Sequence, residues 1–440
     1  MNILYIHTHD SGRYLSPYGY SVPTPNLMRL AKEGTLFRRA FCTAPTCSPS
    51  RVGMLSGMVP HTSNMLGLAH RGFQMEDYSF HLANYLGRKG FETVLCGVQH
   101  EAPQTDMIGY HRILEVEKEK EYPCSSVEKD KKNAEKVANY IRLSDTNKPF
   151  FLSFGMQNTH RDYPPHQDFV DPGYVMPAFP LADTKENRED MADYMRSAQV
   201  VDQCVGTVLQ ALNESGRDKD TIVLFTTDHG IAMPFMKCNL YDTGIGVALI
   251  IKYPENPAAG KVCDALVSHL DVFPTLCELT GTEKPEWLQG VSMLPLFRDP
   301  DTEIRNEIFA EVNYHAAYEP LRCIRTNQYK LIRFYDYHNS HIPANIDGSF
   351  PKELLLQTEW LSMPRDREML FDLWMDPIER VNLVKEQAYK EIYNELSQKL
   401  WDWMKRTRDP LLKYRYRVPA PENARINVLS STSPNSQIFE

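Results

Sequence analysis

The chain has 440 residues, of which 42% are hydrophobic and 24% are charged, as in an ordinary globular protein of two or three domains, or of one large domain with an appendage. The 48 basic and 57 acidic residues give a formal net charge of -9. This balance argues against a general binder of nucleic acid or of anionic membranes, but it permits a local cationic pocket. No apolar run approaches the roughly 20 residues that a membrane-spanning helix needs.

The amino terminus and the cysteines bear on the cellular compartment. Residues 1–6 lack a basic segment and a cleavage site of small residues, so they are typical of a strand rather than of a signal peptide. Nine cysteines in a chain of this length are too few and too irregularly spaced for a disulfide scaffold, and no Cys-x-x-Cys pair occurs. We therefore expect reduced thiols and a cytoplasmic location.

Short apolar runs alternate with helical patterns over the first 300 residues. The runs, which predict parallel strands buried on both faces, are 2–8, 92–97, 149–156, 221–227 and 247–252. The helical patterns are 25–32, 80–88, 127–142 and 189–212. This alternation predicts an α/β fold with a doubly wound sheet.

The pattern changes after residue 300. Three closely spaced strand candidates follow, which favours antiparallel pairing, and they are 308–312, 321–326 and 329–334. A predicted helix at 386–405 precedes a tail from Asp409 that we expect to be extended. The sequence thus predicts a large α/β domain over residues 1–300 and a smaller α+β subdomain with an antiparallel sheet over residues 301–440.

Imidazole and carboxylate groups follow four of the predicted strands. In an open α/β sheet, ligands bind at the carboxyl ends of the strands. The residues at these positions are His9 and Asp10, His100, His160, and Asp228 and His229. Chance would seldom arrange such chemistry at four strand ends, so we expect a functional site there.

The segment Cys47-Ser48-Pro49-Ser50-Arg51 carries the sharpest signal. Ser48 is a candidate N-cap and Pro49 suits the first position of a helix, which would put Cys47 at a helix amino terminus, where anions are favoured. Arg51 adds a cation one turn further on. The pattern indicates an activated nucleophile beside a tetrahedral anion, although Cys47 considered alone could equally be a buried cysteine next to a surface arginine.

Cys-x-Pro-Ser-Arg followed by Leu-Ser-Gly resembles the signature of the type I sulfatases, which belong to the alkaline phosphatase-like superfamily. Further similarities to that family extend through the chain at residues 24–31, 268–275 and 370–383. Among sulfatases, residues 239–241 and 320–322 are most similar to the heparan N-sulfatase branch. The resemblance implies a large mixed, mostly parallel sheet sandwiched by helices, with a C-terminal subdomain that helps to form the substrate pocket.

The resemblance also implies the nucleophile and a metal site. In the family a maturation enzyme oxidises the cysteine, here Cys47, to formylglycine, whose hydrated aldehyde attacks sulfur. A divalent metal would be bound by the side chains at Asp10, Asp228, His229, Cys47 and His9. His9 departs from the family, which has aspartate there, and it could ligate or only donate a hydrogen bond. We expect calcium on family grounds, with manganese open because nitrogen ligands favour it.

Three further residues take roles in the reaction by resemblance. His100 would accept a proton from the formylglycine hydrate, His160 would protonate the leaving group, and Lys237 would contact the sulfate. Val98 departs from the family's Gly-Lys-x-His pattern, so one cationic contact is missing. Candidates for the sugar pocket are His315, Arg322, His70 and Arg71. His7, inside the first strand, is expected to be a packed core histidine.

The activity that the resemblance implies is hydrolysis of a sulfate ester or sulfamate on a small sulfated carbohydrate of the glycosaminoglycan type, by double displacement. One alternative is a phosphodiesterase or phosphonate monoester hydrolase, since those relatives share the formylglycine motif and an Asp-His metal pair. A less favoured alternative is a glycan-binding pseudosulfatase without activity, suggested by His9 and Val98. No nucleic-acid or membrane partner is expected.

Overall fold

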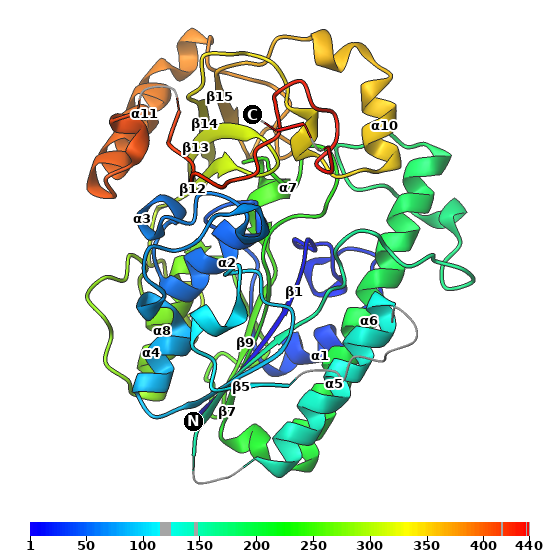
Figure 1. Cartoon of the computed structure of the whole chain (residues 1–440), viewed down its shortest axis with the longest axis vertical. Coiled ribbons are helices and arrows are strands. Elements are labelled where there is room, and N and C mark those ends of the chain that lie inside the picture. The colour runs from blue at the N-terminus through cyan, green and yellow to red at the C-terminus, as the bar shows by residue number, and fades with distance from the viewer. Residues whose placement is uncertain (115–124, 145–147, 415–416, 437, 440) are drawn as a thin grey trace.

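A mostly parallel sheet of eight strands forms the centre of the computed structural model, which describes residues 1–114, 125–144, 148–414, 417–436 and 438–439 (Figure 1). In spatial order its strands are β10 (Lys261–Cys263), β2 (Thr35–Phe37), β9 (Leu249–Lys252), β7 (Thr221–Thr227), β1 (Asn2–Thr8), β6 (Phe150–Gly155), β4 (Glu92–Gly97) and β5 (Arg112–Ile113). β1 lies at the centre and pairs in parallel with both β6 and β7. The sheet class that the sequence predicts is therefore confirmed.

The predicted parallel strand at 247–252 is wrong in two respects. It is divided into β8 (Gly246–Val247) and β9, and β9 runs antiparallel to β2 and β7. β8 belongs to a separate three-stranded sheet with β3 (Ala40–Phe41) and β11 (Val267–Ser268). An apolar run indicates a strand that is buried on both faces, but it does not indicate the direction of that strand. The predicted parallel pairing was therefore wrong.

Helices cover both faces of the main sheet. In β1, Ile3 and Tyr5 pack into one core and Leu4 and Ile6 into the other, as period-two alternation requires of a strand buried on both sides. One face is covered by α1 (Pro25–Glu33), α5 (Ser126–Leu143) and α6 (Lys185–Glu214), and the other by α2 (Cys47–Ser56), α4 (Leu82–Arg88) and α8 (Val272–Thr280) (Figure 1). Shorter helices are α3 (Pro60–Ser63), α7 (Asp242–Ile245), α9 (Leu294–Arg298) and α10 (Phe350–Leu356).

Helix α2 begins two residues earlier than the sequence predicts. Thr46, not Ser48, is the N-cap residue, and Cys47 is the first residue of the helix. Ser48 is not free to cap because its Oγ accepts a hydrogen bond from the Ala69 amide at 3.0 Å. Cys47 nevertheless lies at a helix amino terminus, as expected, and the macrodipole there favours negative charge.

The C-terminal part contains a four-stranded antiparallel sheet, which confirms the predicted pairing. Its strands are β12 (Glu307–Tyr314), β13 (Tyr318–Thr326), β14 (Tyr329–Phe334) and β15 (Glu368–Asp372), and helix α11 (Lys390–Arg406) packs against it. The tail, which we expected to be extended, starts with a 3-10 turn at Pro410–Leu412. Among the described helices, none has the length and apolar character to cross a bilayer, and each described cysteine is a buried free thiol.

A buried network of charges joins this sheet to helix α3 of the N-terminal part of the chain. Arg322 on β13 is fully buried, and its guanidinium donates to Asp409 Oδ1 at 2.9 Å and to Asn313 Oδ1 at 2.9 Å. Glu311 on β12 completes the network by binding His61 in α3. Arg322 was a candidate for the sugar pocket, but its hydrogen-bonding groups are all directed into this network, so it has a structural role.

Replacing Arg322 by Met is expected to lower the free energy of unfolding by about 3–5 kcal/mol, because the Asp409 and Glu311 carboxylates lose their buried cation. Denaturant unfolding of the two proteins measures the change. Arg142→Met is the matched control, since the exposed Arg142–Glu214 pair should contribute nothing measurable. An Arg322→Met protein of normal stability but raised KM would instead restore the pocket assignment.

Candidate active site

The carboxyl ends of β1 and β7 are fastened to each other at the edge of the main sheet. The Asp10 amide donates to Asp228 Oδ1 at 2.9 Å, and the Gly12 amide donates to the carbonyl of His229 at 2.8 Å. The two loops approach so closely that a Cβ added to Gly12 would lie 3.0 Å from the Cα of Gly230. This close approach fixes the side chains that follow the two strands.

Four buried side chains form a cluster at this edge. Ligand atoms of His9, Asp10, Cys47 and Asp228 all lie within 4.8 Å of one another. Both ring nitrogens of His9 and Oδ1 of Asp10 lack a hydrogen bond. Buried polar atoms without partners are costly, so a set that converges in this way fits a divalent cation that would satisfy them.

His229 directs a lone pair into the same cluster. Its Nδ1 lies 2.9 Å from the carbonyl oxygen of Gly230, which can only accept, so Nδ1 carries the proton. In the neutral ring, which is the form that binds a metal, Nε2 then carries the lone pair, and it lies 3.3 Å from Asp10 Oδ1 and 3.4 Å from Cys47 Sγ. A carbonyl that fixes the tautomer of a histidine is a common feature of metal ligands.

Two cations compensate the buried carboxylates. Burial acts to raise the pKa of Asp10, but Lys237 and His229 lower it below its usual value. Burial also acts to raise the pKa of Asp228, and His229 and Arg51 bring it well below the usual range. Both groups are therefore ionised at neutral pH, as metal ligands must be.

Arg51 lies beneath the cluster and is almost completely buried. Its guanidinium donates to Asp228 Oδ2 at 2.9 Å and to the carbonyl of Thr8 at 3.0 Å, and it contacts His7 Nδ1 at 2.6 Å. Arg51 thus holds a candidate ligand in place. His7 is a buried histidine, as expected, and its Nε2 bonds to Ser153 Oγ at 3.1 Å.

Lys237 lies between two carboxylates. Its Nζ is 2.9 Å from Asp10 Oδ2 and 2.8 Å from Asp347 Oδ2. Asp347 was not among the residues singled out from the sequence. It lies outside every recognisable motif and 110 residues from Lys237, so only the folded chain reveals it.

His160 lies at the mouth of the cluster, on a loop that helix α5 holds. Asp130 of that helix accepts hydrogen bonds from the amides of Gln157 at 2.9 Å and Asn158 at 2.8 Å. His160 Nε2 is 4.0 Å from Asp10 Oδ2, and 30% of the side chain is exposed. It can therefore reach both the cluster and a bound substrate.

His70 and His100 form a stacked pair on the other side of His9. His70 Nδ1 lies 2.8 Å from His100 Nε2, and the centres of the His100 and His9 rings are 6.2 Å apart. Burial, followed by nearby His9, lowers the pKa of His100 well below its ordinary value. The sequence thus placed both His70 and His100 close to the cluster, although it did not foresee their contact.

The two remaining pocket candidates differ in their surroundings. His315 is buried, its Nδ1 has no hydrogen bond, and burial followed by Lys237 lowers its pKa well below its ordinary value, so it faces the site as a neutral imidazole. Arg71 instead donates to Asn427 Oδ1 at 3.0 Å and to the carbonyl of Arg425 at 2.9 Å. Arg71 therefore holds the C-terminal tail next to His70 and does not point into the cluster.

The mostly parallel sheet, covered by helices on both faces, thus carries acidic and imidazole groups at its strand ends, beside a cysteine at a helix amino terminus. The chain belongs to the Sulfatase family, whose profile matches residues 1–282. A second profile, for the C-terminal region of N-sulphoglucosamine sulphohydrolase, matches residues 228–348.

Three known proteins illustrate the similarity. The N-sulphoglucosamine sulphohydrolase of Homo sapiens is 27% identical, over 93% of this chain and 91% of that protein. An ulvan-active sulfatase of Formosa agariphila is 26% identical, over 98% of this chain and 79% of that protein. The solved structure of a 2-O GAG sulfatase superposes with a TM-score of 0.74 at 22% identity, over 96% of this chain and 95% of the other.

Replacing His9 by Asp is expected to raise the preference for calcium over manganese by at least about tenfold, because an oxygen ligand replaces a nitrogen. Calorimetric titration of the chelator-treated protein with each ion measures the two affinities. Asp228→Asn serves as the control and should weaken the binding of both ions. An unaltered preference in His9→Asp would show that His9 is not a ligand.

Proposed function

We propose that this sulfatase hydrolyses sulfate esters or sulfamates of a sulfated carbohydrate, with a formylglycine derived from Cys47 and a divalent metal ion. The observation that carries the proposal is the buried cluster of Cys47 with His9, Asp10 and Asp228. Burial raises the pKa of the Cys47 thiol well above its ordinary value, so the unmodified thiol is a poor nucleophile. This setting fits a cysteine that is the precursor of another nucleophile.

His9, Asp10, Asp228, His229 and the side chain at position 47 would hold the metal, which when bound supplies positive charge that activates the nucleophile and neutralises the sulfate oxygens. The hydrate of formylglycine supplies two hydroxyl groups on one carbon, one as nucleophile towards sulfur and one through which the aldehyde is regenerated. The maturation enzyme that makes formylglycine is the partner this requires.

The protein's own groups place charge and protons around the reacting sulfate. Lys237 presents a fixed cation beside Asp10, and Arg51 holds Asp228 from below. His160, partly exposed at the mouth, protonates the leaving oxygen or nitrogen. The His70–His100 pair accepts the proton of the second hydroxyl, and the hydrogen bond between the rings lets them share it.

The similar proteins support a sulfated carbohydrate as the substrate. One acts on N-sulphoglucosamine, one is active on ulvan, and one is a GAG sulfatase. The match of residues 228–348 to the N-sulphoglucosamine sulphohydrolase C-terminal family covers His315 and Asp347. We therefore expect glucosamine sulfates, including the N-sulfate, to be among the best substrates.

A second candidate function is hydrolysis of phosphate diesters or phosphonate monoesters. The Asp228–His229 pair favours it, because an imidazole there directs a lone pair towards the candidate metal site. The fold by itself does not decide between the two chemistries.

A substrate panel separates these possibilities. We expect kcat/KM for sulfate release from N-sulfoglucosamine or glucosamine 6-sulfate to be at least about a hundredfold higher than kcat/KM for hydrolysis of a phosphate diester or a phosphonate monoester. Ion chromatography of the released anions measures all four reactions. Faster cleavage of the phosphorus compounds would reverse the assignment, and activity on O-sulfated sugars alone would remove the sulfamate.

Replacing Cys47 by Ala is expected to abolish sulfate release, with a loss of at least about 10⁴-fold, because no nucleophile remains at this position. Intact-mass measurement of the unchanged chain, produced with the maturation enzyme, should show conversion of the thiol to an aldehyde. Cys42→Ala is the matched control, since Cys42 is also a buried free thiol. An active Cys47→Ala protein would contradict the mechanism. If Cys47 of the unchanged chain stays unmodified and the protein releases no sulfate, the pseudosulfatase is favoured.

A further inference from the structure

Asp347 comes from the C-terminal subdomain and reaches the candidate active site. It lies between the 3-10 turn Pro343–Asn345 and helix α10. Its Oδ2 is 2.8 Å from Lys237 Nζ, and 16% of its side chain is exposed while Lys237 is only 3% exposed. Of the two carboxylates that pair with Lys237, Asp347 is therefore the one that solvent or a substrate can reach, since the side chain of Asp10 is wholly buried.

A carboxylate at this position requires an explanation, because the substrate of a sulfatase is an anion. Asp347 is ionised, since burial acts to raise its pKa but the cation of Lys237 brings it below the usual value. Lys237 already has a counterion in Asp10 at 2.9 Å. Among the described residues, Lys237 is the only one that forms an ion pair with Asp347, so most of the acceptor capacity of its two oxygens is unused.

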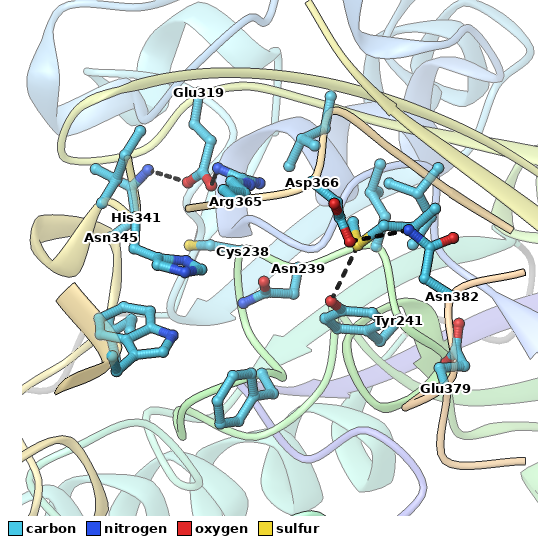
Figure 2. Close-up of a pocket in the computed structure, with 18 of the residues that line it drawn as sticks. Cys238, Asn239, Tyr241, Glu319, His341, Asn345, Arg365, Asp366, Glu379 and Asn382 are labelled. Carbon is cyan, nitrogen blue, oxygen red and sulfur yellow. Dashed lines mark hydrogen bonds and ion pairs between the residues drawn. The ribbon is translucent and has the colours of Figure 1, made fainter. Parts of the chain in front are cut away.

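The loop that carries Asp347 is held firmly from behind. In Figure 2 the carboxylate of Glu319 lies between the side chains of Asn345 and Arg365. Asn345 Nδ2 donates to Glu319 Oε2 at 2.6 Å, Asn345 Oδ1 accepts from the Ala317 amide at 2.8 Å, and Arg365 pairs with Glu319 at 2.5 Å. These contacts fix the backbone two residues before Asp347.

The same network lines a cavity of about 260 Å³ between the C-terminal sheet and the loop at 235–241 (Figure 2). Cys238 and Asn345, which lie on its wall, are the near neighbours in sequence of Lys237 and Asp347. Two segments, 237–238 and 345–347, thus separate the cavity from the cluster. The polar contacts on the cavity side are made by Asn345, and none of them uses the Asp347 carboxylate.

We propose that Asp347 is a substrate-recognition residue, which accepts a hydrogen bond from a hydroxyl or amine on the sugar ring that carries the scissile sulfate. This inference rests on the proposed function and specifies it further. His315 lies beside Asp347 with an unused Nδ1, so the subdomain offers two groups that suit a ring rich in hydrogen-bond donors. Lys237 offsets the repulsion between Asp347 and the sulfate.

The test compares a sugar with a substrate that has no such donors. For Asp347→Asn and Asp347→Ala, kcat/KM is measured on N-sulfoglucosamine, on glucosamine 6-sulfate and on p-nitrophenyl sulfate. For whichever sugar the wild-type protein cleaves, we expect kcat/KM of the variants to fall about ten- to a hundredfold further than it falls for the aryl sulfate. The fall should come mainly from a higher KM, since a hydrogen bond to a charged group is lost. A larger loss on the 6-sulfate than on the N-sulfate would identify the amine as donor, because only the 6-sulfate carries a free amine, and the reverse would identify a hydroxyl.

Equal losses of kcat/KM on the sugar and the aryl sulfate would overturn the proposal, because Asp347 would then only position Lys237. The absence of any loss would overturn it as well. Asp366→Asn is the matched control, since Asp366 lines the far side of the cavity and pairs with Asn382 at 3.0 Å. Failure of the proposed function looks different: the wild-type protein itself would release no sulfate from any sugar. Thermal unfolding of each variant identifies those that fail to fold.

Discussion

The concentration of negative charge at one edge of the sheet is the constraint on which the structure depends. Asp10 and Asp228 are wholly buried within the same cluster, and two ionised carboxylates without compensation there would be strongly destabilising. Arg51 and Lys237 provide cations from helix α2 and from the loop after β7. β1 and β7 must therefore end, and α2 must begin, at the same point, and the parallel pairing of β1 with β7 brings the two strand ends together.

By resemblance to other sulfatases, neutral side chains replace charged ones at two positions of the site. His9 occupies a position where sulfatases have aspartate, and Val98 one where they have lysine. Burial lowers the pKa of His9 to about 4 and that of His70 to about 4, so both rings are neutral at physiological pH. By resemblance we expect calcium in this site, and the nitrogen ligands His9 and His229 leave manganese open.

The C-terminal subdomain completes the site rather than merely covering it. Its buried network through Arg322 and Asp409 attaches it to the catalytic half, and its tail holds Arg71 and lies beside His70. Asp347 then reaches Lys237 from the same side. Under the proposed function, the groups that act on sulfur come from the sheet edge and the groups that face the rest of the substrate come from the C-terminal part, which would allow specificity to vary while the chemistry is retained.

The sequence alone determined the sheet class, the helix-terminal position of Cys47 and the gathering of His9, Asp10 and Asp228, because strand periodicity and short motifs are local properties. It misjudged the direction of β9 and the role of Arg322, since burial patterns do not encode strand direction or the partner of a charged group. Only the tertiary structure revealed Asp347, the His70–His100 contact and the tail held by Arg71. These are pairings between segments far apart in the chain, and side-chain packing, not local pattern, decides them.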